Sequence, residues 1–265
     1  MFKLAIAFLL LLLALCLAVS VFQNRILFPT HLVGRAGSLP AGTQPLGIDT
    51  PDGYHLEGVH IPPSRENPAG RLLVVGFAGN AWNSADAADY LSEVYPEAHV
   101  VAFHYRGYSP STGSPTAKAL LEDAPLVLDA AVRRVKPDRT ILAGFSIGSG
   151  VAASLAGSRK LDGIILVTPF DSLKAVAQGH YPWLPVGLFF REEMNAAESL
   201  SRSDVAVAII SAERDTLIPP ARTDALRRRV RNLVLDRTVA KAGHNDIYQA
   251  SAFHDAMCDA LAALP

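Results

Sequence analysis

The chain has 265 residues, of which 50% are apolar and 18% are charged. This composition can fill a sizeable hydrophobic core, and it excludes an intrinsically disordered chain. The formal net charge is -1, which excludes a global electrostatic field that would attract nucleic acid. We therefore expect a globular protein without a nucleic-acid partner.

The cysteines and histidines indicate no metal site. Cys16 lies in an apolar N-terminal segment and Cys258 lies near the C-terminus, so a disulfide between them is not expected. The eight histidines are scattered, and no pair has the i, i+4 spacing of zinc ligands on a helix. We expect neither a metal nor another cofactor.

The segment from Leu4 to Phe22 is almost wholly apolar and carries no charge. A helix over this segment is about 28 Å long at about 1.5 Å per residue, which is enough to cross a hydrocarbon core. We therefore predict a transmembrane anchor over residues 1–23 and one domain over residues 24–265.

The charges that flank the apolar segment predict its orientation. Lys3 precedes the segment and Arg25 follows it. With the basic Lys3 end inside, the domain would lie on the periplasmic or another extracytoplasmic side of a membrane. The alternative is a cleavable signal peptide with Ala18 and Ser20 at the cleavage site, which would give a secreted domain.

Beyond Pro40, apolar runs typical of strands alternate with segments typical of helices. The first two runs flank Pro51-Asp52-Gly53, a turn sequence, which predicts an antiparallel β-hairpin. The later runs lack the alternation of a half-buried strand, which indicates strands buried on both faces of a parallel sheet. Together they predict an α/β fold with a mostly parallel, doubly wound sheet and an antiparallel N-terminal hairpin.

The expected strands are residues 46–50, 54–61, 71–77, 100–104, 140–145, 163–168, 205–211 and 233–238. The expected helices are residues 84–95, 117–135, 147–156, 220–230 and 246–263. Ser84 is the expected N-cap of the first of these helices, because its hydroxyl can accept a hydrogen bond from a free backbone N–H group. Residues 172–203 interrupt the alternation without a regular pattern of their own.

Gly144-Phe145-Ser146-Ile147-Gly148 matches the pattern G-x-S-x-G where an expected strand meets an expected helix. A serine on such a sharp turn sits in strained backbone, and the flanking glycines let strand and helix pass closely. The N–H groups at the start of the helix then point toward a developing oxyanion. This favours Ser146 as a nucleophile. The alternatives are a helix start that only caps its helix, and a dinucleotide-binding loop, whose G-x-G-x-x-G spacing is absent.

A serine nucleophile needs a base, and a histidine base needs an acid that fixes its tautomer. In chains with this serine motif the acid and then the histidine follow the serine, each on a loop after a late strand. Asp215 and His244 occupy these two positions. We predict His244 as the base and Asp215 as its acid. Asp171, after an earlier strand, is the rival acid, and His254, inside the last expected helix, is a weaker base.

The loop at residues 77–83 follows the third expected strand, where a second oxyanion donor is usually found. Gly79 would let the backbone turn inward. The backbone N–H of Asn80 would then point to the same oxygen as that of Ile147. We predict these two groups as the oxyanion hole; the alternative is a plain turn.

These motifs resemble the membrane-anchored α/β-hydrolase-domain serine hydrolases, near the serine aminopeptidase branch of the α/β-hydrolase superfamily. The resemblance extends from about Leu46 to Tyr248. It rests on the early hairpin at residues 49–58, on Tyr105-Arg106-Gly107-Tyr108 with residues 113–115, on the serine motif, and on residues 215–219 and 243–246.

Some positions depart from this family. The family usually has HGNAGN after the third strand, and here Ala78 replaces the histidine and Trp82 replaces a glycine. Ser109 stands where a glycine usually follows the YRGY motif. The backbone donor at Asn80 should survive these changes, but the rigidity of its loop and the shape of an acyl pocket are in doubt.

The resemblance implies an α/β-hydrolase that cleaves an ester or thioester through an acyl-enzyme. The implied partners are a small-molecule or lipid-like acyl substrate and, through the N-terminal segment, a membrane. Three alternatives remain open: a non-catalytic scaffold that binds a lipid or protein partner, a peptidase or amidase, and an anchored lipid-handling protein with incidental esterase activity.

The irregular stretch 172–203 lies where a lid insertion often sits in this family. It contains an apolar block at residues 181–190. We hypothesise that Trp183, Leu188 and Phe189 line an acyl pocket or touch the membrane. The alternative is a lid that packs on its own domain.

Overall fold

The computed structural model describes residues 2–157, 159–183 and 185–265. The strands of its central sheet are β1 (Gln44–Asp49), β2 (His55–Ile61), β3 (Leu72–Phe77), β4 (Ala98–Phe103), β5 (Arg139–Phe145), β6 (Gly163–Val167), β7 (Val207–Ala212) and β8 (Leu233–Val239). They lie in the order β1-β2-β4-β3-β5-β6-β7-β8. β2 pairs antiparallel with both β1 and β4, and every other neighbouring pair in this order is parallel. The predicted α/β fold with a mostly parallel sheet and an antiparallel N-terminal hairpin is confirmed.

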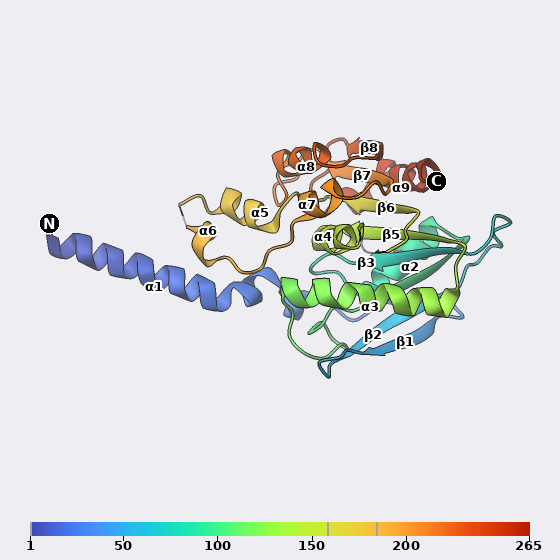
Figure 1. Cartoon of the computed structure of the whole chain (residues 1–265), viewed down its shortest axis with the longest axis horizontal. Coiled ribbons are helices and arrows are strands. Elements are labelled where there is room, and N and C mark those ends of the chain that lie inside the picture. Colours follow the sequence, from blue (N-terminus) through green and yellow to red (C-terminus); the bar gives the residue numbers. More distant parts are fainter. Residues whose placement is uncertain (1, 158, 184) are drawn as a thin grey trace.

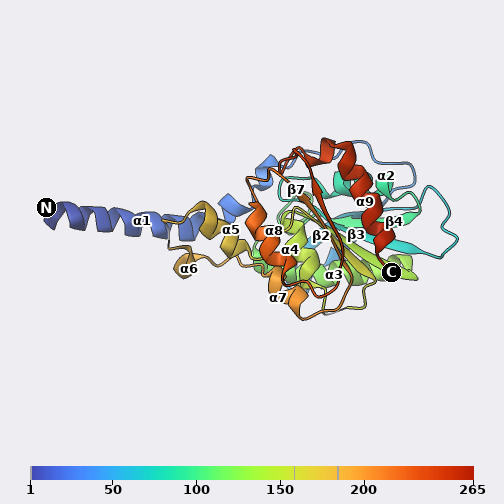
Figure 2. The same cartoon turned by 90° about the horizontal axis from the view of Figure 1, so that it is seen from above.

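Helices cover both faces of this sheet (Figure 1, Figure 2). The α-helices are α1 (Phe2–Leu27), α2 (Ser84–Val94), α3 (Ala117–Val135), α4 (Ile147–Ser154), α5 (Leu173–His180), α6 (Val186–Phe189), α7 (Ala196–Ser201), α8 (Pro220–Arg227) and α9 (Ser251–Ala263). Two short 3-10 helices are η1 (Thr30–Leu32) and η2 (Ile247–Gln249). Helices α5, α6 and α7 lie within residues 172–203, the irregular stretch between β6 and β7.

Successive side chains of the central strands enter two separate hydrophobic clusters. In β3, Leu73 and Val75 join the cluster that contains side chains of α3 and α4. Leu72 and Val74 join the cluster formed with α2 and α9. Burial of each such side chain stabilises the fold by about 1.5–3 kcal/mol. Because both faces are buried, the sequence of β3 needs no polar alternation, which explains its uniformly apolar pattern.

Helix α2 begins one residue earlier than its expected cap implied. The N-cap is Asn83, whose side-chain oxygen accepts from the Ala85 N–H group at 2.9 Å. The predicted cap, Ser84, is the first helical residue. The Asn83 amide caps the helix with its oxygen while its separate nitrogen donates to Gly34 O at 2.9 Å, which also ties the start of α2 to the N-terminal segment.

The C-terminal half of α1 docks on residues 186–191, while its N-terminal half extends away from the domain (Figure 1). Cys16 is buried against Val186. The buried side chain of Gln23 accepts from the Arg191 N–H group at 2.9 Å and donates to Phe189 O at 3.4 Å.

These contacts make the end of α1 a part of the domain. Across the described part of the chain, no helix has the combination of length and apolar character that a membrane crossing requires. The predicted single-pass anchor over residues 1–23 is therefore wrong. The extracytoplasmic placement of the domain, which depended on that anchor, falls with it.

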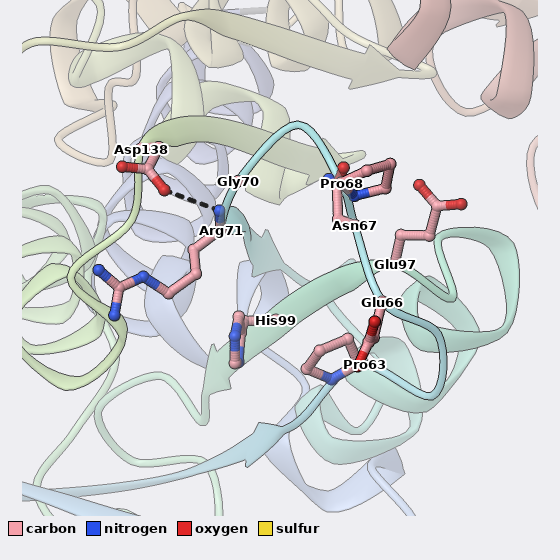
Figure 3. A pocket seen from close by; sticks show the side chains of 9 residues that line it. All are labelled: Pro63, Glu66, Asn67, Pro68, Gly70, Arg71, Glu97, His99 and Asp138. Atoms are coloured by element: carbon pink, nitrogen blue, oxygen red, sulfur yellow. Dashed lines mark hydrogen bonds between the residues drawn. The ribbon is translucent and has the colours of Figure 1, made fainter.

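An open pocket of about 570 Å³ lies where the parallel strands begin (Figure 3). Arg71 directly precedes β3 and Asp138 directly precedes β5, and the Asp138 carboxylate accepts from the Arg71 N–H group at 2.8 Å. His99 of β4 also lines this pocket. Ser146 follows the other end of β5, so the pocket is remote from the predicted nucleophile.

His99 also contacts a buried histidine on the neighbouring strand. His60 of β2 and His99 of β4 approach within 3.0 Å, from Nε2 to Nδ1. Burial, together with the positive charges of His99 and Arg134, lowers the pKa of His60 from the ordinary 6.5 to about 4. The folded state therefore holds His60 neutral in the range where the unfolded chain takes up a proton.

We expect this histidine to make the folded state less stable in mild acid. The unfolded chain binds more protons than the folded chain between pH 6.5 and 4, so stability is full above pH 6.5 and falls as the pH drops toward 4. The loss attributable to His60 should be about 2 kcal/mol. Urea unfolding from pH 7 to pH 4.5 should therefore show a shallower pH dependence for His60→Leu than for the wild-type chain. The matched control is His254→Gln on the exposed face of α9, and an unchanged slope in His60→Leu would contradict the prediction.

Candidate active site

Ser146 occupies a strained turn between β5 and α4. Its φ is 52° and its ψ is -115°, a region that residues with a side chain rarely adopt. The Ser146 N–H group donates to Val167 O at 2.9 Å, and its carbonyl accepts from the N–H group of Ser149 at 2.9 Å. These bonds hold the turn to β6 on one side and to α4 on the other.

The glycines of the motif are required by close backbone contacts. A Cβ atom on Gly144 would lie 2.5 Å from Gly148 O. A Cβ atom on Gly148 would collide with the carbonyls of Phe77 and Ala78, just after β3. The start of α4 can therefore approach the ends of both strands only because these positions lack a side chain.

His244 connects the Ser146 hydroxyl to a carboxylate. Its Nε2 lies 2.9 Å from Ser146 Oγ, and its Nδ1 lies 2.7 Å from Asp215 Oδ2. Facing a carboxylate, Nδ1 carries the proton, which leaves the Nε2 lone pair free to accept from the serine hydroxyl. The exposed fractions of Ser146, His244 and Asp215 are 9%, 8% and 6%, so the three groups interact largely without competing water.

Neighbouring loops position the acid and the histidine. Asp215 lies just after β7, and its Oδ1 accepts from the N–H groups of Leu217 and Ile218 at 2.9 and 2.7 Å. His244 follows β8, and the Ala242 carbonyl in its loop accepts from the Arg214 N–H group at 2.8 Å. Because β7 and β8 are adjacent parallel strands, the two loops leave the same edge of the sheet.

The two rival residues lie elsewhere. Asp171 pairs with Arg222 at 3.3 Å. His254 is exposed on α9, with its Nε2 3.8 Å from Cys258 Sγ. Among the predicted acids and bases, the structure brings only Asp215 and His244 into one hydrogen-bonded chain with Ser146.

The loop after β3 lies beside Ser146. A Cβ atom on Gly79 would stand 3.9 Å from Ser146 Cβ. Within residues 2–157, 159–183 and 185–265, the backbone N–H groups of Asn80 and Ile147 donate to no acceptor. Two free donors beside the serine fit the predicted oxyanion hole.

Two tyrosines that the sequence reasoning did not single out hold this loop. The Tyr105 hydroxyl donates to Ala78 O at 2.8 Å, and the Tyr108 hydroxyl donates to Asn80 Oδ1 at 2.5 Å. Both belong to the YRGY motif, whose two spaced aromatics were the available signal. Arg106 between them pairs with Asp123 at 2.6 Å and so ties their loop to α3.

Trp82 fills a space that a glycine would leave open. Its ring lies 5.1 Å from that of Phe145 and 5.2 Å from that of Tyr248, measured between centroids. Phe145 precedes Ser146 and Tyr248 follows the loop of His244, so Trp82 connects three segments that border the candidate site. Such aromatic pairs add about 0.5–1.5 kcal/mol each beyond the burial of their surface.

The residues predicted to line an acyl pocket lie around α6. Trp183 is 62% exposed. Phe189 is partly buried and packs with Cys16 and Val186 at the junction with α1. The side chain of Leu188 lies outside the described part of the structure. Contact of these residues with a substrate stays a prediction.

The side chains of the described residues do not form any of the arrangements that bind metal ions in proteins. There, no group of three or more His, Cys, Asp or Glu side chains is arranged to hold a metal ion. The reacting groups that the geometry offers are the serine hydroxyl, the imidazole and the backbone N–H donors.

Comparison with known proteins identifies the fold. The alpha/beta hydrolase fold family matches residues 72–194. An alpha-beta hydrolase from Vibrio vulnificus superposes with a TM-score of 0.71 at 17% identity, covering 91% of this chain and 92% of that one. The esterase Pf2001 of Pyrococcus furiosus superposes with a TM-score of 0.66 at 21% identity, covering 88% and 97%.

The chain also has relatives that are similar in sequence. The uncharacterized protein Rv2307c of Mycobacterium tuberculosis (strain ATCC 25618 / H37Rv) is 30% identical over 211 residues, which are 78% of this chain and 74% of that protein. The lysophosphatidylserine lipase ABHD12 of Danio rerio is 32% identical over 141 residues, which are 46% of this chain and 36% of that protein. The sheet, the family match and these relatives show that the chain belongs to the α/β-hydrolase superfamily, a membership that supports a hydrolase activity.

Proposed function

We propose that this chain is a serine hydrolase that cleaves a carboxylic ester or thioester through an acyl-enzyme on Ser146. One observation carries the proposal. The buried chain from Asp215 Oδ2 through His244 to Ser146 Oγ has heavy-atom distances of 2.7 and 2.9 Å. Both lie within the range in which a proton can be transferred along a hydrogen bond.

The proposed reaction has two steps. Ser146 Oγ attacks the acyl carbon while His244 Nε2 takes the hydroxyl proton, and the alcohol or thiol leaves with that proton. Water then attacks the acyl-enzyme, gives a proton to the same imidazole, and releases the carboxylic acid as Ser146 recovers its hydrogen. Asp215 stabilises the imidazolium in both steps and stays ionised.

The negative charge that develops on the carbonyl oxygen needs donors. The free N–H groups of Asn80 and Ile147 beside Ser146 support this role. Ile147 is also the first residue of α4, whose N-terminal dipole end favours negative charge. A single donor of this kind contributes about 10²–10³ in kcat.

The substrate class rests on relatives and on composition. One relative is named a lysophosphatidylserine lipase and one structural neighbour an esterase. The apolar block around α6, with Trp183 exposed, would suit an acyl chain. We therefore propose a small-molecule or lipid-like acyl substrate.

Loss of the nucleophile should abolish activity. Ser146→Ala removes the atom that bonds to the acyl group, so hydrolysis of p-nitrophenyl butyrate should fall by about 10⁴-fold or more, and a fluorophosphonate probe should no longer label the chain. The matched control is Ser154→Ala at the end of α4, the helix that follows Ser146, a change that leaves the site intact. Persistent labelling of Ser146→Ala would contradict the assignment of Ser146 as the nucleophile, and an unlabelled wild-type chain would favour a non-catalytic scaffold.

Removing the negative charge of Asp215, which lies beside the His244 imidazole, should also lower kcat. Asp215→Asn keeps the size of the side chain but no longer fixes Nδ1 as the protonated nitrogen, so kcat should fall by about 10³–10⁴. Asp171→Asn, which changes the rival acid, should retain activity. Equal losses in the two variants, measured on chains with the same melting temperature, would contradict the assignment of Asp215.

The acyl-pocket hypothesis predicts a change in chain-length preference. Trp183→Ser should lower the ratio of long-chain to short-chain ester hydrolysis by about fivefold, because contact with one or two methylene groups is lost. Val132→Ser on α3 is a matched change of an exposed apolar residue away from the site. Identical ratios in Trp183→Ser and in the wild-type chain would refute the hypothesis.

A further inference from the structure

The end of α1 and the segment that follows it are bound to the loop beside Ser146. The side-chain amide of Asn80 donates from Nδ2 to the carbonyl of Leu27, the last residue of α1. Three residues further along that loop, Asn83 Nδ2 donates to Gly34 O at 2.9 Å. Phe28 is 2% exposed and belongs to the same hydrophobic cluster as Ile147. The N-terminal segment is therefore packed into the carboxyl edge of the sheet.

The same segment is bound to the stretch between β6 and β7. The side chain of Gln23 bonds to the backbone of Phe189 and Arg191 with both its polar atoms. Residues 23–37, which we call the strap, thus join the end of α6 to the loop of Asn80. Both neighbours of the strap border the proposed acyl site.

Both polar atoms of the Asn80 side-chain amide are held by hydrogen bonds, from Tyr108 and to Leu27, and we call this arrangement the clamp. Oδ1 accepts from the Tyr108 hydroxyl at 2.5 Å, and Nδ2 donates to Leu27 O. With one partner that only accepts and one that donates, the amide has a single orientation. Burial raises the pKa of Tyr108 above its ordinary value, so its hydroxyl keeps its proton at neutral pH.

Both hydrogen-bond partners of the Asn80 amide are themselves held in place by other contacts. Tyr108 is 3% exposed, and its ring packs edge-on against Tyr105 with centroids 5.8 Å apart. Tyr105 in turn donates to Ala78 O, two residues before Asn80. Leu27 is held by the burial of Phe28, the next residue. The amide of Asn80 thus lies between two fixed points of the fold.

We propose that Tyr108 and the Leu27 carbonyl are positioning groups that fix the direction of the Asn80 backbone N–H. The proposal rests on the function proposed above, in which that N–H binds the oxyanion. Fixing both polar atoms of a side chain fixes its torsions and therefore its Cα. Gly79, which precedes Asn80, has the freedom to rotate the following peptide if the clamp is lost. A donor displaced by about 1 Å loses much of its effect on the rate.

Two single substitutions each break one half of the clamp. Tyr108→Phe removes the donor to Oδ1 but keeps the ring and the Leu27 contact. Asn80→Asp keeps an acceptor for Tyr108 but places a carboxylate oxygen, which cannot donate, against the Leu27 carbonyl. Each variant should lower kcat about tenfold with KM within about twofold of the wild-type value.

Controls of matched chemistry exist elsewhere in the fold. Tyr95→Phe removes a buried hydroxyl that donates to Met257 O at 2.8 Å. Asn232→Asp removes an amide that donates to Asp204 O at 3.1 Å, close to the start of β8. Both lie near the amino ends of the parallel strands, and both should leave kcat unchanged.

A reversible trifluoromethyl ketone inhibitor separates positioning from general destabilisation. This inhibitor forms an oxyanion on Ser146, so its Ki should rise in each clamp variant by the factor by which kcat/KM falls. A purely structural role would lower the melting temperature without that proportionality. Unchanged Ki and kcat in both folded variants would overturn the proposal.

Amide hydrogen exchange gives a readout that does not depend on catalysis. Residues 78–83 should exchange faster in both clamp variants and at the wild-type rate in both controls. Faster exchange would support the clamp even if Ser146 proved inactive, in which case only the proposed function would fail. Unchanged exchange together with unchanged kcat would overturn the clamp, while hydrolysis that depends on Ser146 would still support the proposed function.

Discussion

The close approach of α4 to the ends of β3 and β5 is the constraint on which the candidate site depends. Ser146 stands at this junction with a positive φ, and Gly148 passes the carbonyl of Phe77 without room for a single methyl group. Ser146 and the loop of Asn80 are therefore positioned relative to each other by direct contact between their backbones. Side chains can shift by rotamer changes, whereas this junction cannot move without disturbing the sheet itself.

The remaining groups are supplied by the topology around that junction. β7 and β8 are neighbours, so Asp215 and His244 arrive at one edge although 29 residues separate them. Each oxygen of the buried Asp215 carboxylate has donors, from backbone N–H groups on one side and from the imidazole on the other. A buried charge without such partners would cost several kcal/mol. The polar network is thus compatible with an apolar interior because it is fully paired.

The sequence allowed the fold and the arrangement of Ser146, Asp215 and His244 to be predicted because both have local signatures. Buried parallel strands give uniform apolar runs, and the serine motif marks a turn that few sequences can form. The contact between Asn80 and Leu27 joins positions 53 residues apart through one side chain and one carbonyl, and no periodicity records it. The membrane anchor was wrong because hydropathy describes residue character alone, whereas Gln23 makes the end of α1 part of the domain. The cap of α2 differs by one residue, since the two polar atoms of the Asn83 amide bond separately to the Ala85 N–H group and to Gly34 O.

The strap has a practical consequence for work on this protein. Shortened versions of the chain that begin after α1 would lose Gln23 and the Leu27 carbonyl while keeping every strand of the sheet. Such a fragment lacks the Leu27 partner of Asn80, so slow turnover by it would reflect the missing segment and not a poor choice of substrate. Screening for the natural substrate should therefore start from a chain that keeps residues 23–37, because the strap contacts both the end of α6 and the loop beside Ser146.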